Sequence, residues 1–285
     1  MGQDFYENSE TAKAVFDRAT ELLGFSVPEL CFEKNDRLDI TEYTQAAMVT
    51  TSVCHDEGDG GARHPCGCGG WFKLGEYCAL VAAGVMTADD AIRTVRKRGI
   101  LMQEAVPAGV GGMSAVLGMT ADEINAVVDE IPNVQVANYN CPGQIVISGL
   151  KEAVETAAVK LKEAGARRVI PLNVSGPFHS YLLEEAGEKL GKFLENIPVA
   201  EPVIPYVANV TAAYVTKAED VKPLLTRQVS SSVRWQQSVE TMLADGVDRF
   251  IEIGPGKTLA GFIRKINREA TVINIEKFED LEKLN

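Results

Sequence analysis

Trp71-Phe72-Lys73-Leu74-Gly75-Glu76-Tyr77-Cys78-Ala79-Leu80-Val81-Ala82-Ala83-Gly84 is the stretch that decides the fold. Small and apolar residues dominate after Glu76, which is typical of a buried helix. We expect a sharp turn before that helix, which thrusts one side chain out. Because backbone N–H groups at a helix start can stabilise a developing oxyanion, the stretch predicts a catalytic turn.

The composition limits the classes of protein that this chain can represent. Its 285 residues are enough for one large domain, or for one domain with an insertion. A formal net charge of −12 disfavours nucleic acid and anionic membranes as partners. No apolar run approaches membrane-spanning length and no signal pattern opens the chain, so we expect a cytoplasmic protein. Six scattered cysteines then predict free thiols rather than disulfides.

The order of predicted elements indicates two lobes. Strands alternate with helices at both ends of the chain, which predicts a mostly parallel α/β sheet. The middle of the chain instead follows the order β-α-β-β-α-β, which is that of a ferredoxin-like fold. We therefore expect a hydrolase-like α/β large lobe of residues 1–110 and 176–285, with a ferredoxin-like small lobe of residues 111–175 inserted into it.

Two motifs resemble those of the malonyl-CoA:acyl-carrier-protein transacylases (S-malonyltransferases). Leu74-Gly75-Glu76-Tyr77 matches the end of the family motif Gly-x-Ser-x-Gly-Glu-Tyr, whose serine carries the acyl group. Here Lys73 stands at the position of the serine, and Trp71 at that of the first glycine. Ser175-Gly176-Pro177-Phe178-His179-Ser180 matches the segment of the family's catalytic histidine.

The resemblance implies catalytic roles for particular residues. His179 is expected to act as general base towards the nucleophile and then as acid towards the leaving thiol. A backbone carbonyl, which we place at Asp245, is expected to orient its imidazole. The Leu74 N–H is expected to serve as an oxyanion donor. The alternative for His179 is an ordinary surface histidine on a loop.

The resemblance also implies a substrate site. Arg98 matches the arginine that binds the malonyl carboxylate, and a planar guanidinium suits that task. Three amide side chains match further binding positions: Gln45, Asn138 and Asn140. The alternatives are a solvated helix face for Arg98, because Arg93, Arg96 and Lys97 lie nearby, and turn chemistry for the two asparagines.

On this resemblance we expect transfer of malonyl from malonyl-CoA to the phosphopantetheine thiol of acyl carrier protein in fatty acid biosynthesis. The reaction would pass through an acyl-enzyme, with no metal or organic cofactor. One alternative is a catalytically inactive acyl-CoA- or acyl-carrier-binding protein, because Lys73 cannot form the usual ester. Another is a zinc-stabilised interaction module built on cysteines and histidines of residues 54–68: Cys54, His55, His64, Cys66 and Cys68.

A shifted reading frame would explain both the lysine at position 73 and the glycine-rich composition of residues 53–73. Read one base later, the Trp71 codon must become a glycine codon, and those of Phe72 and Lys73 can become leucine and serine codons. From Cys54 onwards the same shift allows Ala-Met-Thr-Arg-Val-Met-Glu-Glu-His-Gly-Ile-His, a helical string. We predict compensating single-base shifts near codons 53 and 73. By the family pattern we also expect an N-terminal strand to be missing ahead of Met1.

Overall fold

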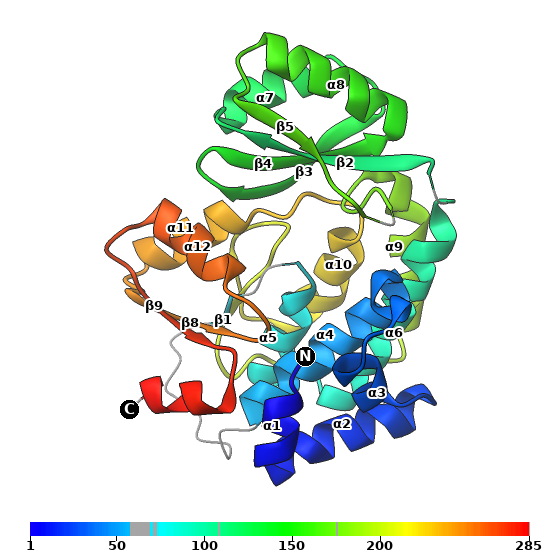
Figure 1. The fold of residues 1–285 in the computed structure, drawn as a ribbon, viewed down its shortest axis with the longest axis vertical. Coiled ribbons are helices and arrows are strands. Elements are labelled where there is room, and N and C mark those ends of the chain that lie inside the picture. The colour runs from blue at the N-terminus through cyan, green and yellow to red at the C-terminus, as the bar shows by residue number, and fades with distance from the viewer. Residues whose placement is uncertain (58–68, 71–72, 108, 175, 285) are drawn as a thin grey trace.

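The computed structural model describes residues 1–57, 69–70, 73–107, 109–174 and 176–284. The first part of the chain forms a helical layer (Figure 1). It contains α1 (Gln3–Asn8), α2 (Glu10–Leu23), α3 (Val27–Phe32), α4 (Thr41–Glu57), α5 (Glu76–Ala82) and α6 (Ala88–Ala105), with the 3₁₀ turns η1 (Asp36–Asp39) and η2 (Lys73–Gly75). The Ser9 hydroxyl accepts a hydrogen bond from the Ala12 N–H and caps α2, because it satisfies one of the free N–H groups at the helix start.

Helices α4 and α6 lie in close contact, and a glycine makes this possible. A Cβ placed on Gly99 of α6 would lie 2.6 Å from the Glu42 Cα of α4, which is too close for any larger residue. The close approach brings Arg98, which precedes this glycine, against α4.

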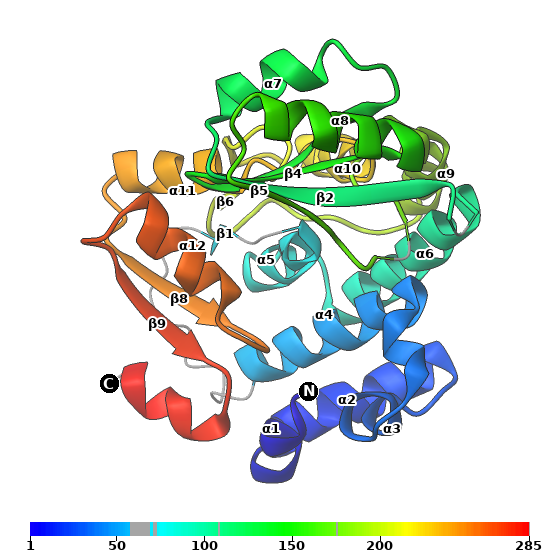
Figure 2. The same cartoon turned by 45° about the horizontal axis from the view of Figure 1, so that its top comes forward.

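The small lobe has the predicted ferredoxin-like order. Its elements are β2 (Gly111–Leu117), α7 (Ala121–Val128), β3 (Val134–Cys141), β4 (Gln144–Leu150), α8 (Lys151–Glu163) and β5 (Arg168–Pro171). The four strands pair antiparallel in the order β3-β4-β2-β5. Helices α7 and α8 cover the sheet face that points away from the other elements (Figures 1 and 2). Thr120 and Glu123 form a capping box at the start of α7, and the lobe has its own hydrophobic cluster.

The C-terminal part of the chain returns to the large lobe. Its elements are η3 (Tyr181–Leu183), α9 (Glu184–Leu194), β6 (Tyr206–Val207), β7 (Tyr214–Val215), α10 (Ala218–Gln228), α11 (Trp235–Ala244), β8 (Arg249–Ile253), α12 (Thr258–Ile266), β9 (Thr271–Ile275) and η4 (Phe278–Leu284). β6 pairs in parallel with β1 (Gly69–Gly70) and antiparallel with β7, and β8 pairs in parallel with β9. In the described residues the large lobe thus has two small sheets, where a single mostly parallel sheet was expected.

Prolines lie at the ends of two strands. β6 begins at Tyr206, directly after Pro205, and is two residues long. β5 ends at Pro171. A proline has no N–H to donate to a neighbouring strand, so it favours a strand end over a strand interior.

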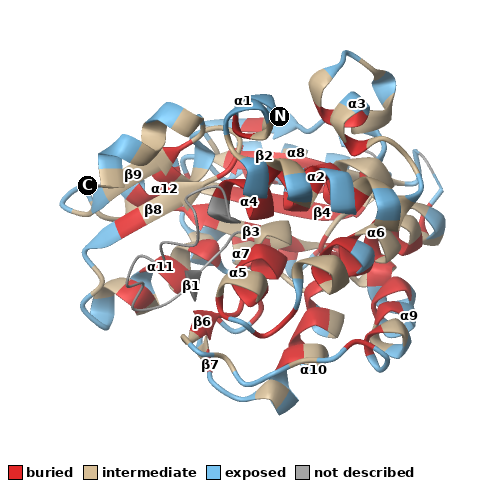
Figure 3. Ribbon diagram, turned by 90° about the horizontal axis from the view of Figure 1, so that it is seen from below, coloured by how far each residue is buried: buried red, intermediate tan, exposed pale blue. Residues whose placement is uncertain are grey.

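Burial is concentrated where the elements face one another, and exposed residues lie on the outward faces (Figure 3). In α5 all residues from Glu76 to Leu80 are buried, as expected for the small-residue helix. A charged residue, Glu76, therefore stands at the start of a helix inside the main core. In the described parts of the chain, no helix combines the length and apolarity needed to cross a membrane.

Candidate active site

Lys73 and His179 both have a left-handed backbone. Their φ angles are 56° and 57°, and they are two of the four non-glycine residues with positive φ in the described chain. This conformation costs a side-chain-bearing residue of order 1–3 kcal/mol, and such strain clusters at functional sites. Lys73 opens η2, which leads directly into α5, so the sharp turn predicted before the buried helix is present.

The imidazole of His179 is held by a backbone carbonyl. Its side chain is buried, and Nδ1 lies 2.9 Å from the main-chain oxygen of Gln228. Because a carbonyl only accepts hydrogen bonds, Nδ1 carries the proton and Nε2 is left with a lone pair. His179 is therefore in the tautomer that a general base requires.

The prediction that Asp245 supplies this carbonyl is wrong. Both residues stand at helix ends, Gln228 as the last residue of α10 and Asp245 just after α11. The last carbonyls of a helix have no partner inside it, so either position has an oxygen to offer. The tertiary arrangement selects α10, because its end faces the loop of His179.

Burial and nearby positive charges keep His179 neutral. Burial lowers its pKa well below the ordinary value, and the charges of Lys73 and Arg98 lower it further. Burial, followed by the charge of Arg98, also lowers the pKa of Lys73 to about 8. The site therefore combines a neutral imidazole with an amine that loses its proton more readily than an ordinary lysine.

Gln135 of β3 ties the small lobe to the His179 loop. Its Nε2 donates to the main-chain oxygens of His179 at 3.2 Å and Ser230 at 3.4 Å. Its Oε1 accepts from the Tyr181 N–H at 3.0 Å. A side chain of the small lobe thus holds the backbone that directly follows the histidine.

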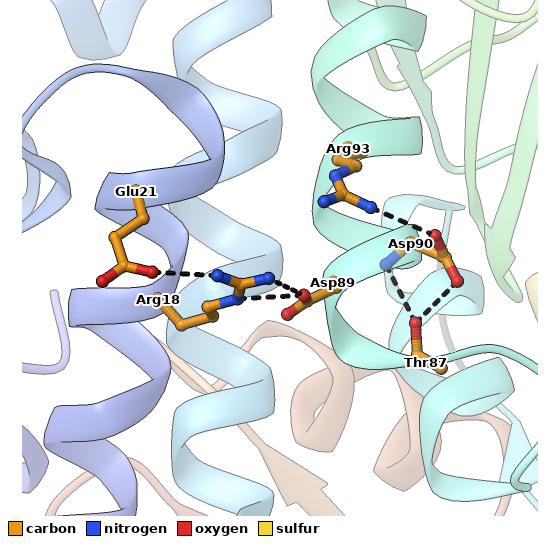
Figure 4. Close-up of polar contacts among 6 residues, drawn as sticks. All are labelled: Arg18, Glu21, Thr87, Asp89, Asp90 and Arg93. Carbon is orange, nitrogen blue, oxygen red and sulfur yellow. Dashed lines mark hydrogen bonds and ion pairs between the residues drawn. The ribbon is translucent and has the colours of Figure 1, made fainter.

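Arg98 is an interior residue, so the solvated-face alternative is wrong for it. Only 3% of Arg98 is exposed. Arg93 instead pairs with Asp90 at 3.6 Å on the surface of α6 (Figure 4), and Arg96 pairs with Glu42 at 2.8 Å. In the same view Arg18 of α2 reaches Asp89 and Glu21, an exposed ion-pair group that joins α2 to α6 (Figure 4).

The hydrogen-bond partners of Arg98 are neutral. Nη1 donates to Oε1 of Gln45 at 2.7 Å, and Nη2 donates to Oε1 of Gln228 at 3.3 Å. Its Nε has no hydrogen-bond partner among the described residues. A buried cation without a hydrogen-bonded carboxylate is costly to maintain, and it is suited to bind an anionic group from a ligand. Gln45, also predicted for the site, lies on α4 and orients this arginine.

Gln228 joins the parts of the site. Its main-chain oxygen faces His179, its Oε1 faces Arg98, and its Nε2 donates to the Lys73 carbonyl at 3.0 Å. Beside it, Oδ1 of Asn209 accepts the Lys73 N–H at 2.7 Å. No motif pointed to Gln228, Asn209 or Gln135, because each acts through tertiary contacts. Glu76 belongs to the motif Leu74–Tyr77, but the sequence predicted no role for it.

The other predicted residues are placed as follows. Leu74 is in the first turn after Lys73, where N–H groups lack helical partners. Asn138 and Asn140 are buried in β3, and no hydrogen bond to His179 or Arg98 is present for either within the described chain. Hairpin residues 142–143 follow β3, so the asparagines belong to the strand rather than to the turn.

Part of the predicted zinc cluster can be placed. Cys54 and His55 are buried in α4, whereas His64, Cys66 and Cys68 lie outside the described residues. Within the described residues no group of three or more suitable side chains is positioned to hold a metal ion. Four of the cysteines are described, and all are free thiols: Cys31, Cys54, Cys78 and Cys141.

Comparisons with known proteins match the chain along almost its whole length. The acyl transferase domain model matches residues 1–278. The malonyl CoA-acyl carrier protein transacylase of Bacillus subtilis is 44% identical over 289 residues, covering 99% of this chain and 90% of the relative. The crystal structure of the Clostridium perfringens transacylase superposes with a TM-score of 0.93 at 42% identity, covering 100% and 91%. The structure of a malonyl-transacylase in complex with its type II PKS acyl-carrier protein superposes with a TM-score of 0.95 at 35% identity. This match covers 99% of this chain and 93% of that transacylase chain.

These findings place the molecule among the acyltransferase enzymes, with the two-lobe α/β fold of that class. Within the class, the chain belongs to the acyl transferase domain family. The comparisons give no support to the alternative of a catalytically inactive binding protein.

Proposed function

We propose that this protein transfers a malonyl group from malonyl-CoA to the phosphopantetheine thiol of an acyl carrier protein in fatty acid biosynthesis. One observation carries the proposal: Gln228 contacts a neutral His179 with its backbone and the buried Arg98 with its side chain. A base and a carboxylate-binding cation therefore converge beside the strained turn at residue 73. The malonyl CoA-acyl carrier protein transacylases that match this chain over nearly its whole length support the same reaction.

The geometry supports a two-step acyl transfer. The nucleophile at position 73 attacks the thioester carbon, and Nε2 of His179 accepts its proton. The Leu74 N–H, at the start of the helical segment, stabilises the oxyanion. The C–S bond then breaks, and His179 returns the proton to the departing coenzyme A thiolate. In the second step the carrier thiol gives its proton to His179 and attacks the acyl group. The bond between the acyl group and the nucleophile then breaks, and His179 returns the proton to the released nucleophile.

The residue at position 73 decides whether the acyl group can move on. A serine forms an ester, which a thiol attacks readily in such a site. An amine forms an amide, whose resonance makes it a poor acyl donor. The full cycle therefore calls for a serine at position 73, and the shifted reading frame supplies one.

Arg98 holds the malonyl carboxylate with Gln45 beside it, and Asn138 and Asn140 line the cleft between the lobes. Residues 111–175 form the small lobe and residues 1–110 and 176–285 the large one, supported by the separate hydrophobic clusters. No metal or organic cofactor takes part. The free thiols among the described residues are typical of the cytoplasm, which we propose as the location of the protein.

The function is tested by incubating the purified protein with radiolabelled malonyl-CoA and holo acyl carrier protein. The assay is run with the chain as printed and with a version in which the frame of residues 54–73 is restored. We expect label on the holo carrier with the frame-restored version, and none with apo carrier, which lacks the thiol. If neither version labels the holo carrier while both are folded, the proposed function is wrong.

A further inference from the structure

Glu76 has a place in the site that the reaction described so far does not use. It is the first residue of α5 and only 1% exposed. Its Oε2 accepts three hydrogen bonds: from the Asn209 main-chain N–H at 3.2 Å, from Asn209 Nδ2 at 2.7 Å and from Gln228 Nε2 at 2.5 Å. A buried carboxylate in such a position is unexplained by packing, because burial of a charge is costly.

We propose that Glu76 is a positioning residue that fixes the amide orientations of Asn209 and Gln228, and through them the substrate-binding state of Arg98. The inference rests on the proposed function, because it concerns the recognition of the malonyl carboxylate. Glu76 itself touches neither substrate nor reacting atoms in this assignment.

A carboxylate and an amide differ in the hydrogen bonds that they can make. An ionised carboxylate only accepts hydrogen bonds, whereas an amide can present either its NH₂ group or its oxygen. Both amides must therefore turn their NH₂ groups towards Glu76. This leaves Oδ1 of Asn209 for the Lys73 N–H at 2.7 Å and Oε1 of Gln228 for Arg98 at 3.3 Å.

The reversed orientation of Gln228 would damage the site. Its NH₂ group would then face the guanidinium of Arg98, so that a donor opposes donors and one arm of the arginine loses its acceptor. The Lys73 carbonyl would lose its donor as well. Glu76 thus selects the one amide orientation in which Arg98 is held and the backbone of the turn is bonded on both sides.

A purely structural role for Glu76 predicts something different. Loss of a structural residue would weaken folding and would lower the affinity for all substrates together. Loss of a residue that positions Arg98 would lower the affinity for substrates with a free carboxylate more than the affinity for those without one. The ratio of malonyl-CoA to acetyl-CoA affinity therefore separates the two roles, and it does not depend on turnover.

The experiment measures the affinities of malonyl-CoA and acetyl-CoA by calorimetry for the unaltered protein and three variants. Glu76→Met keeps the volume and removes the acceptor, so the preference for malonyl-CoA should fall about tenfold. Glu76→Gln keeps one acceptor oxygen towards both amides, so the preference should stay within about threefold of the original. Tyr77→Phe is the control, because it removes a buried hydroxyl from the same helix that has no hydrogen-bond partner among the described residues.

Glu76→Asp keeps the carboxylate but withdraws it by one methylene, and it serves if Glu76→Met does not fold. Its preference for malonyl-CoA should fall by about threefold or more, because the shorter side chain cannot reach both amides. An unchanged preference in folded Glu76→Met or Glu76→Asp would overturn the inference. Absence of any malonyl preference in the unaltered protein would instead refute the proposed function, on which the inference rests.

Discussion

The main-chain oxygen of Gln228 lies 2.9 Å from Nδ1 of His179, and the side chain of the same glutamine reaches Arg98. One residue therefore orients the base and holds the cation. Because it also donates to the Lys73 carbonyl, a shift of the end of α10 would move three parts of the site together.

His179→Gln should lower the rate of malonyl-carrier formation by about 10²- to 10⁴-fold, which is the usual contribution of a general base. The glutamine keeps a polar side chain of similar size but cannot accept a proton at neutral pH. The rate is measured in the frame-restored protein with saturating malonyl-CoA. A fall of less than about threefold, with a native circular dichroism spectrum, would show that His179 is not the base.

Arg98→Ala should impair malonyl transfer strongly and acetyl transfer little, because only malonyl offers a free carboxylate for the guanidinium. We expect a loss of about 100-fold in kcat/KM for malonyl-CoA. Arg93 is an exposed arginine of the same helix, so Arg93→Ala is the matched control. It should leave kcat/KM unchanged for both substrates. Equal losses for both acyl groups would mean that Arg98 does not bind the carboxylate.

Lys73→Ser should raise the rate of malonyl transfer over that of the chain with lysine at this position. The pKa of Lys73, lowered to about 8, leaves part of the amine neutral near pH 7, so it can attack a thioester once. The amide that results blocks further cycles. Mass spectrometry of the lysine form after incubation with malonyl-CoA should show a stable malonyl adduct on Lys73. Equal multiple-turnover rates in the lysine and serine forms would refute the need for serine.

His55→Met should make the protein more resistant to acid. The His55 ring stacks on Phe5 at 3.9 Å between ring centroids, and neither ring nitrogen has a hydrogen-bond partner among the described residues. Burial lowers its pKa to about 4. The unfolded chain therefore binds a proton at higher pH than the folded one, and His55 costs stability as the pH falls from about 6.5 to about 4.

Between these two pH values His55 should lower the free energy of unfolding by about 3 kcal/mol, because each unit of pKa difference corresponds to about 1.4 kcal/mol. Urea unfolding at about pH 7 and about pH 4.5 measures it as the difference between His55→Met and the unaltered protein. The lowered pKa of His179 also makes stability depend on pH, but both proteins contain His179, so its contribution cancels in the difference between them. A pH-independent difference between the two would contradict this account of His55.

Sequencing of the gene across codons 50–75 should show compensating single-base shifts. The structure adds a reason at the start of the segment, where Cys54 and His55 are fully buried on α4. Read one base later, these two positions can carry alanine and methionine, which suit a buried helix face better than an imidazole without partners. A gene sequence that encodes residues 54–73 as they stand, or a peptide of the purified protein that contains Trp71-Phe72-Lys73, would refute the prediction.

The sequence by itself determined most of the architecture. The small and apolar residues after Glu76 predicted the buried helix α5, and the order of elements in the middle of the chain predicted the ferredoxin-like lobe. These features depend on neighbours in sequence, and local backbone preferences report them directly. The motifs also located His179, Arg98 and the turn at Lys73.

Only the tertiary structure decided which groups those residues contact. Helix ends at Gln228 and Asp245 offer similar carbonyls, and nothing local distinguishes them. Among the arginines of α6, only the packing of α4 against Gly99 shows that Arg98 is interior. Glu76 gained a role when Asn209 and Gln228, which lie 133 and 152 residues away, were brought against it. Hydrogen bonds of this range depend on how whole elements pack, and a local sequence pattern carries no record of that packing.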